Sequence, residues 1–166
     1  RLIMALKRSK RTRQKTAVMM LDLDNFKDVN DRWGHATGDL LLKNVAHRLA
    51  LQVRDTDTVA RQGGDEFSIV LSSLNSTEDA LMIAEKIVAS FNRPFSLDGI
   101  DVSVTASVGI ALYPDHGDTC EDLLKKADQA MYEAKNRGRH RACLYRPPSL
   151  PEQGPEVKNS GDAAVR

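Results

Sequence analysis

The sequence predicts a single α/β (α+β) domain in which a mixed, mostly antiparallel central sheet is flanked by helices. Three observations support this fold class. Segments with strand and helix periodicity alternate along the chain, and the pair Gly63-Gly64 joins two strand-like segments near its middle. Hydrophobic residues make up 41% of the 166 residues, which is enough for one domain with a hydrophobic core.

The first half of the chain is expected to hold helices, a buried strand and a hairpin. Residues 1–14 have the pattern of a basic amphipathic helix, and the apolar run 16–22 ends in an acid, as a buried central strand can. Residues 25–38 are expected to form a loop and a short helix, after which apolar residues recur at helical spacing. Residues 58–71 are expected to form a hairpin, because two adjacent glycines favour a tight turn with positive φ.

The second half is expected to hold two helices and two strands. One helix is expected to begin near Ser76 and another near Thr119, where hydroxyl residues can cap the first turn. Residues 101–111 alternate clearly and predict one strand, and residues 141–146 predict a short final strand. On the first of these strands we expect one face to carry Val102, Val104, Ala106, Val108 and Ile110, and the other to carry Ser103, Thr105 and Ser107.

Composition and charge argue against several classes of function. The net charge of +1 favours neither a nucleic-acid coat nor a binder of acidic surfaces. Cys120 and Cys143 lie in no metal-binding or redox spacing, which is compatible with a reducing compartment. No apolar run reaches the roughly 20 residues that span a bilayer. From residue 147 proline, glycine and polar residues replace the periodic pattern, so we expect the folded domain at 1–146 and a disordered linker or tail at 147–166.

Two acidic clusters are candidates for a metal site. The first, Asp22-Leu23-Asp24-Asn25-Phe26-Lys27, ends the predicted buried strand, where ligands gather in open α/β sheets. Carboxylates there suit Mg²⁺, although this cluster taken alone fits capping or turn roles better. The second is Asp65-Glu66 beside the glycine turn, where adjacent like charges repel and a divalent cation would offset the repulsion. If the hairpin lies beside the strand, Asp22 and Asp65 can share one ion.

The second cluster is part of a longer pattern that resembles a known family. Gly63-Gly64-Asp65-Glu66-Phe67 is similar to the signature of the GGDEF family of diguanylate cyclases. The resemblance covers roughly residues 1–146, and so many matches in register are not expected by chance. The other matching segments are 22–27, Asn30-Asp31, Gly34-His35, Gly38-Asp39, Ser107-Val108-Gly109-Ile110, Ala127-Asp128, Met131-Tyr132, Ala134-Lys135 and Gly138-Arg139.

The resemblance implies a fold similar to the palm of nucleotide polymerases and adenylyl cyclases, with a two-metal site. The implied metal ligands are the carboxylates of Asp22 and Asp65 and the backbone carbonyl of Leu23, holding two Mg²⁺ (or Mn²⁺) ions per active site. Asp65 is also the implied proton acceptor, and Glu66 supports the same acidic corner. Lys27 is implied to stabilise charge on the phosphates during transfer.

The resemblance also implies which residues contact the phosphates of GTP. Backbone N–H groups around Asn25 and Phe26 open a short helix, which suits anion binding. Lys135 and Arg139 are the implied side-chain contacts to the terminal phosphates. This gives a role to the group of basic residues near the end of the domain, Lys135, Arg137, Arg139, Arg141 and Arg146.

The guanine base is implied to be read by Asn30 and Asp39. A carboxylate can accept from the guanine N1–H and N2–H₂ donors, and adenine offers no such pair of donors. His35 is a further implied neighbour of the substrate, and a hydrogen-bonded loop histidine is an equally good interpretation. Because Asn30 and Asp39 suit guanine, a related cyclase that uses ATP is disfavoured.

An Arg-x-x-Asp pair formed by Arg54 and Asp57 lies ahead of the hairpin, with Arg54 nine positions before Gly63. In the family this spacing marks a product-inhibition site, and arginine can donate two hydrogen bonds to guanine O6 and N7. The alternative is a surface ion pair near a helix end. The register favours the regulatory interpretation.

The implied activity is the cytoplasmic condensation of two GTP molecules into cyclic di-GMP with loss of pyrophosphate. One domain holds one GTP, so catalysis requires a homodimer across a two-fold axis. The alternative function is a catalytically weak module that binds GTP or cyclic di-GMP and regulates a neighbouring domain, as in proteins that join GGDEF and EAL domains. We expect no nucleic-acid partner and no membrane contact by this domain.

Two departures from the family pattern carry expectations of their own. The family's Asp-x-Leu-Thr-Gly-Leu segment does not precede the first helix, so the N-terminal edge of the domain is expected to be truncated. Arg61 would then lack a partner that it normally has. His140 stands where the family often has Asn, and little effect on catalysis is expected.

Overall fold

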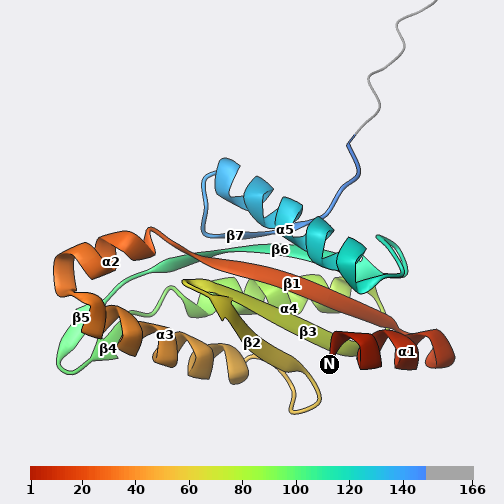
Figure 1. Cartoon of the computed structure of the whole chain (residues 1–166), viewed down its shortest axis with the longest axis horizontal. Coiled ribbons are helices and arrows are strands. Elements are labelled where there is room, and N and C mark those ends of the chain that lie inside the picture. Colours follow the sequence, from red (N-terminus) through yellow and green to blue (C-terminus); the bar gives the residue numbers. More distant parts are fainter. Residues whose placement is uncertain (149–166) are drawn as a thin grey trace, which may run out of the picture.

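A five-stranded sheet forms the centre of the computed structural model, which describes residues 1–148 (Figure 1). Its strands are β1 (Lys15–Asp24), β2 (Thr58–Gly63), β3 (Glu66–Leu74), β6 (Thr105–Tyr113) and β7 (Arg141–Leu144). They lie in the order β2-β3-β1-β6-β7, and every pair is antiparallel except β6 and β7. The predicted mixed, mostly antiparallel sheet is therefore confirmed. The predicted tail lies, from residue 149 onwards, outside the described residues.

Helices cover both faces of this sheet. They are α1 (Leu2–Thr12), α2 (Phe26–Trp33), α3 (His35–Ala50), α4 (Thr77–Ser90) and α5 (Cys120–Asn136). The larger core lies between the sheet and α3 and α4, and the smaller core lies between the sheet and α1 and α5. Within residues 1–148, no helix is both long and apolar enough to cross a membrane.

The central strand β1 contributes to both cores because successive side chains of a strand point to opposite faces. Met19 and Leu21 pack in the larger core, whereas Val18 and Met20 pack in the smaller core beside α5. The same alternation places Asp22 on the α5 face, where α5 supplies its ion-pair partner.

The single strand predicted over 101–111 is wrong in its extent. The backbone leaves strand geometry at Ser103 and Val104, between β5 (Ile100–Val102) and β6. β5 pairs with β4 (Phe95–Leu97) in a separate hairpin, whose turn residues Asp98 and Gly99 have φ values of 49° and 84°. The predicted alternation is confirmed, because the valine face packs in the larger core.

Residues 25–38 contain two helices rather than a loop and one short helix. α3 begins at His35, immediately after Gly34, so Gly38 lies inside a helix and not in a turn. A Cβ atom at Gly38 would lie 1.9 Å from Oδ1 of Asn30. Glycine is therefore required here by the close approach of α2 to α3.

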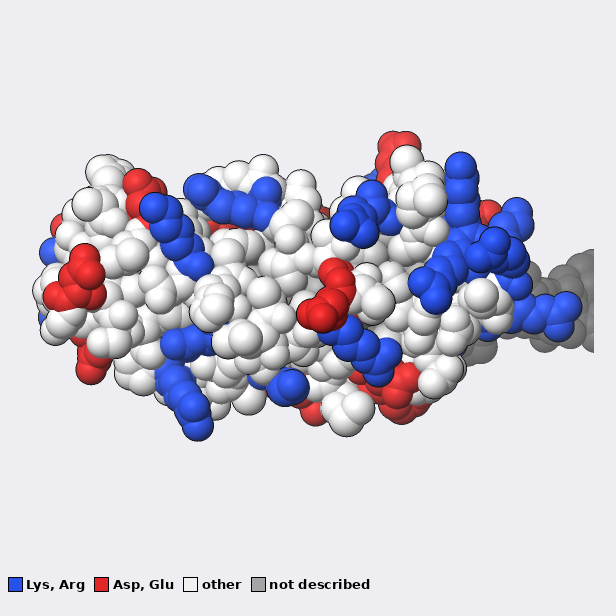
Figure 2. Space-filling view, turned by 90° about the horizontal axis from the view of Figure 1, so that it is seen from below, with Lys and Arg blue, Asp and Glu red and all other residues white. Residues whose placement is uncertain are grey.

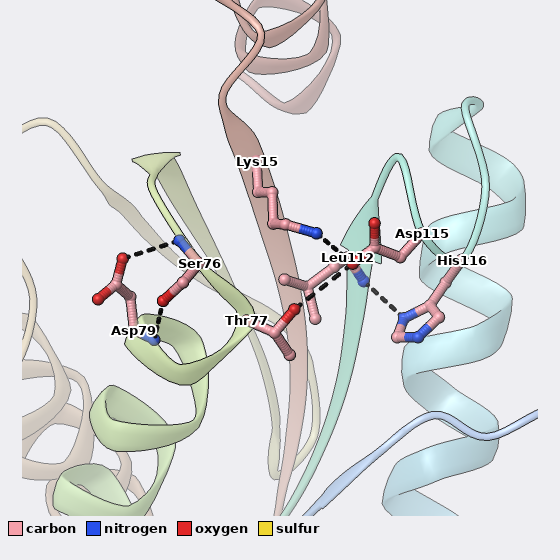
Figure 3. Close-up of polar contacts among 7 residues, drawn as sticks. All are labelled: Lys15, Ser76, Thr77, Asp79, Leu112, Asp115 and His116. Carbon is pink, nitrogen blue, oxygen red and sulfur yellow. Dashed lines mark hydrogen bonds and ion pairs between the residues drawn. The ribbon is translucent and has the colours of Figure 1, made fainter.

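The start of β1 is held by polar contacts with neighbouring elements (Figure 3). Lys15 pairs with Asp115 in the turn between β6 and α5. Nearby, Ser76 caps α4 as predicted: its hydroxyl accepts from the Asp79 N–H at 3.2 Å, and the Asp79 carboxylate accepts from the Ser76 N–H at 3.0 Å. These contacts lie at the end of β1 opposite Asp22, which leaves that acidic end clear for other partners.

The basic residues of 1–14 lie together at one end of the molecule. Figure 2 shows Lys and Arg side chains gathered at the end that carries α1, and this segment contains no acidic residue. The buried face of α1 is small and is formed by Ala5, Leu6 and Ser9, whose hydroxyl bonds to that of Thr16. The predicted basic amphipathic helix is therefore confirmed.

Candidate active site

A cavity of about 220 Å³ lies where β1 ends and α2 begins. It joins three segments that are far apart in the sequence: the end of β1 with the start of α2, the turn between β2 and β3, and the end of α5. The lining residues are Asp22, Leu23, Asp24, Asn25, Phe26, Lys27, Asp65, Lys135 and Arg139. All of them except Asp24 are site residues predicted from the sequence.

Strand pairing brings the acidic turn beside the acidic end of β1. β1 and β3 are antiparallel neighbours, with Asp22 opposite Glu66, and the Leu23 N–H donates to the Asp65 carbonyl at 3.3 Å. The predicted hairpin is confirmed, and Gly64 has a φ of 51°, which favours glycine. Asp65 lines the cavity, whereas Glu66 is half-buried beside it and does not.

Asp22 is a buried acid in a crowded electrostatic environment. It is 8% exposed, and its Oδ1 lies 3.0 Å from Nζ of Lys135 on α5. Burial raises the pKa of Asp22, and the neighbouring charges of Asp65 and Glu66 raise it further, while Lys135 acts in the opposite direction. The single positive charge of Lys135 therefore does not offset the free-energy cost of burying the Asp22 carboxylate near Asp65 and Glu66.

Replacing Lys135 with Met should move the pKa of Asp22 further up, because it removes the hydrogen bond and the positive charge that favour the carboxylate. A folded-state pKa above the unfolded value means that the protonated carboxyl contributes stability below the unfolded pKa. That contribution is lost as the pH rises through the folded pKa, so in the variant the loss should occur at higher pH. A carboxyl-carbon NMR titration of Asp22 measures this. The exposed Lys125→Met on the same helix is the control, and an unchanged titration in K135M would contradict the pairing.

The donors at the cavity fit a hard divalent cation that is shared with a ligand. Asp22, Asp65 and the Leu23 carbonyl offer only oxygen atoms, which Mg²⁺ prefers, and a cation would relieve the crowding of acids. Within the described part of the chain, no three side chains of His, Cys, Asp or Glu group closely enough to hold a metal by themselves. The site therefore fits Mg²⁺ held partly by substrate oxygens, and not a cage made of side chains alone.

Other groups that line the cavity suit phosphate. α2 begins after Asn25, which has a φ of 57° and makes no side-chain capping bond, so the first N–H groups of the helix are open to an anion. Lys27 lies on this first turn, and Lys135 and Arg139 reach the cavity from the end of α5. The cavity thus has an acidic side and a basic side, which meet where Lys135 pairs with Asp22.

Asp24 is the residue of the cavity that sequence reasoning missed. The sequence favours a cap or turn role for it, but Asp24 is 4% exposed and caps no helix among the described residues. Its carboxylate accepts from the hydroxyls of Thr105 and Ser107, both at 2.7 Å, and from the His140 N–H at 3.1 Å. The hydroxyl residues at alternate positions 105 and 107 were the available signal, since they share one face of β6.

The predicted guanine readers lie outside this cavity, at the junction of α2 and α3. Asn30 packs against Gly38, the residue before Asp39. Asp39 is exposed and lines a neighbouring cavity of about 350 Å³ together with Arg61. His35 is the exposed first residue of α3, so the interpretation as a loop histidine is wrong.

Arg54 and Asp57 form a turn in which the acid bonds to backbone. The Asp57 carboxylate accepts from the Arg54 N–H and from the Ser72 N–H, both at 3.0 Å. Among the described residues, Arg54 and Asp57 make no side-chain ion pair, and Arg54 is exposed. Asp57 thus holds the loop to β3 and leaves the arginine side chain facing solvent.

Arg61 has a partner within its own hairpin. Its Nε donates to the Gly64 carbonyl at 2.8 Å. The tight turn brings this carbonyl within reach, and the expectation that Arg61 lacks its partner from the family's N-terminal segment stays a prediction.

Comparisons with known proteins agree with this geometry. The family model "Diguanylate cyclase, GGDEF domain" matches residues 1–141. Diguanylate cyclase TpbB of Pseudomonas aeruginosa is 45% identical over 163 residues, covering 96% of this chain and 38% of TpbB. The bifunctional diguanylate cyclase/cyclic di-GMP phosphodiesterase MucR of the same species is 45% identical over 145 residues, covering 87% of this chain and 21% of MucR. The chain thus spans less than two fifths of the length of these relatives.

Solved structures give the same result. The crystal structure of the GGDEF domain of TpbB, also called YfiN, matches with a TM-score of 0.84 and 48% identity, covering 87% of this chain and 90% of that one. The GGDEF domain of DgcB from Caulobacter crescentus, in complex with c-di-GMP, matches with a TM-score of 0.76 and 26% identity, covering 86% of this chain and 84% of that one.

Proposed function

The chain belongs to the GGDEF domain family of diguanylate cyclases, and from that membership we propose that it condenses two GTP molecules into cyclic di-GMP and pyrophosphate. The observation that carries the proposal is the two-sided cavity. Asp22 and Asp65 meet on its acidic side, and Lys135 and Arg139 close its basic side. This arrangement suits a triphosphate held between cationic side chains and acids that bind a cation.

The residues of the cavity would have different roles in nucleotidyl transfer. Lys27, Lys135 and Arg139 would bind the triphosphate together with the open N–H groups of α2. Asp65 would accept the proton of the attacking 3′-hydroxyl. The 3′-oxygen of one GTP then bonds to the α-phosphorus of the other, and the bond from that phosphorus to the β-phosphate oxygen breaks, so that pyrophosphate leaves. The same step with the two nucleotides in exchanged roles closes the ring and releases the second pyrophosphate.

A divalent cation fits the acidic side of the cavity. The carboxylates of Asp22 and Asp65 and the Leu23 carbonyl would hold Mg²⁺ or Mn²⁺, two ions per site. When bound, these ions would neutralise charge on the triphosphate and lower the pKa of the 3′-hydroxyl. Glu66, which lies opposite Asp22 in the sheet, would add negative charge beside the metal site.

Recognition of guanine is assigned to the junction of α2 and α3. Asn30 and Asp39 can pair with the donors and acceptors on the base edge, and His35 lies at the start of the same helix as Asp39. An inhibitory product site is assigned to Arg54 and Asp57. Since the Asp57 carboxylate bonds to backbone, Arg54 would provide the direct contact with guanine O6 and N7.

The product requires two domains. Cyclic di-GMP is symmetric and each chain offers one such cavity, so two copies would face each other across a two-fold axis, at least transiently. Because GTP is a cytoplasmic substrate, we place the domain in the cytoplasm.

A regulatory module is the second candidate function, and the similarity to NbdA of Pseudomonas aeruginosa, 46% identical over 129 residues, favours it. NbdA is named as a cyclic di-GMP phosphodiesterase and not as a cyclase. A domain of this kind beside a phosphodiesterase could bind GTP or cyclic di-GMP without turning it over. The retained acids Asp22 and Asp65 favour catalysis, because binding alone does not need them.

Turnover of GTP by the purified chain tests the proposal. With GTP and Mg²⁺, chromatography should detect cyclic di-GMP, and the specific rate should rise with protein concentration because the active form is a dimer. ATP is the control and should give no cyclic product. Binding of GTP without product, even at the highest protein concentration, would favour the regulatory module instead.

A further inference from the structure

Asp24 links two segments of the cavity that lie far apart in the sequence. We infer that Asp24 is a positioning residue, which fixes Arg139 in the turn after α5 and, at the same time, the turn that opens α2. The inference rests on the proposed function only in naming the ligand, a nucleoside triphosphate.

The hydrogen bonds of Asp24 satisfy both of its carboxylate oxygens. Oδ1 accepts from the Ser107 hydroxyl at 2.7 Å, and Oδ2 accepts from the Thr105 hydroxyl at 2.7 Å and from the His140 N–H at 3.1 Å. Within residues 1–148 no cationic side chain pairs with this buried acid. Hydrogen bonds from neutral donors therefore hold the carboxylate, and such a fully bonded group has a fixed orientation.

The first segment that Asp24 holds is the turn between α5 and β7. Arg139 and His140 have φ values of 61° and 47°, so two consecutive non-glycine residues adopt the left-handed conformation. Such residues persist only where the surrounding structure holds them. His140 is held by two contacts. Its N–H donates to Asp24, and its ring lies 2.9 Å from Oδ1 of Asn92. Arg139 lies between the end of α5 and His140, so these contacts also restrict Arg139, which lines the cavity.

The second segment is the turn between β1 and α2. Asp24 is the last residue of β1, and Asn25 changes the chain direction with a φ of 57° before α2 begins. Because Asp24 is bonded across to β6, the position of this turn is set by the sheet. The open N–H groups of α2 and the Lys27 side chain therefore start from a fixed point.

One buried carboxylate thus keeps two phosphate-binding walls in register. Without it, the two turns share no side-chain hydrogen bond among those described, and the contact that still joins the end of α5 to the end of β1 is the ion pair of Lys135 with Asp22. Replacing Asp24 with Asn keeps the size but removes the charge, and it presents an amide NH₂ where at least one donor now points. Arg139 should then lose its orientation while the acidic side of the cavity stays intact.

The test measures binding of the non-hydrolysable analogue guanosine 5′-[α,β-methylene]triphosphate by titration calorimetry. In D24N we expect about tenfold weaker binding, since one well-oriented charged contact of about 1.4 kcal/mol corresponds to that factor. In an Arg139→Ala background, D24N should weaken binding by a smaller factor than in the wild-type background, because the share of its effect that acts through Arg139 is already lost and only the share through the turn before α2 remains. Amide exchange at His140, followed by NMR without ligand, should become faster in D24N.

The outcomes separate this inference from the proposed function. Wild-type chain that binds the analogue but forms no cyclic di-GMP would refute the cyclase and leave the inference standing. Equal affinity in D24N and wild type, or full additivity with R139A, would overturn the inference. If D24N does not fold, Ser107→Ala removes one donor only and should weaken binding about two- to threefold, with a smaller effect in the R139A background. If S107A weakened binding tenfold or more, and did so equally in the R139A background, Ser107 would have a purely structural role. That result would also refute the inference.

Discussion

Formation of cyclic di-GMP should fall by about 10³-fold or more when Asp22 or Asp65 is replaced by its amide. Both carboxylates line the cavity, and an amide keeps their shape while removing the charge that a hard cation needs. Initial rates with GTP and Mg²⁺, measured by chromatography on wild type, D22N and D65N, give the comparison. The loss should not be recovered by raising GTP, because the reacting step itself is affected.

The same substitution at Asp22 should not cost stability. Burial and two neighbouring acids raise the pKa of Asp22, so the neutral amide should fit the fold without ions better than the carboxylate does. Measured without divalent cations at neutral pH, the melting temperature of D22N should rise by about 2–4 °C, equivalent to about 1 kcal/mol. A lower melting temperature would instead attribute the lost activity to unfolding.

Asp98→Asn is the matched control for these variants. Asp98 is exposed in the turn between β4 and β5, and its φ of 49° is one that Asn tolerates. The rate of D98N should stay within about twofold of wild type, as is usual for surface changes. Normal turnover by D65N would refute the role of Asp65 as proton acceptor and metal ligand.

Replacing Gly109 with Ala should lower the free energy of unfolding by about 4 kcal/mol or more. A Cβ atom there would lie 2.0 Å from the Ala127 carbonyl oxygen and 2.0 Å from the Met131 nitrogen. Both are backbone atoms of α5, so no side-chain rotation can relieve the overlap, and the whole helix must move away from β6. That helix also carries Lys135, so its displacement should break the pairing with Asp22.

Urea unfolding followed by far-UV circular dichroism measures the effect of G109A. Ser103→Ala is the control, since Ser103 is exposed next to the same strand and should change stability by no more than about 0.5 kcal/mol. A loss below about 1 kcal/mol in G109A would show that α5 does not pack against β6 as closely as the structure has it.

Local features of this protein could be predicted from the sequence alone. Three such features are the hairpin around Gly63-Gly64, the capped start of α4 at Ser76 and the alternation of β6. Each depends on residues that are close in the sequence, so a short stretch of residues is enough to predict it. The cavity residues could be predicted too, because the matching motifs lie at the ends of these local elements.

Contacts between distant residues were decided only by the tertiary structure. Asp24 bonds to Ser107 and to the N–H of His140, which are 83 and 116 residues away, and no local pattern distinguishes this from a turn acid. Gly38 likewise indicates a loop from the sequence. In the structure it lies inside α3, where the close packing of α2 requires a glycine. The reason is physical: periodicity reports which face a side chain takes, whereas the partner it meets there depends on which elements the sheet order and core packing place opposite it.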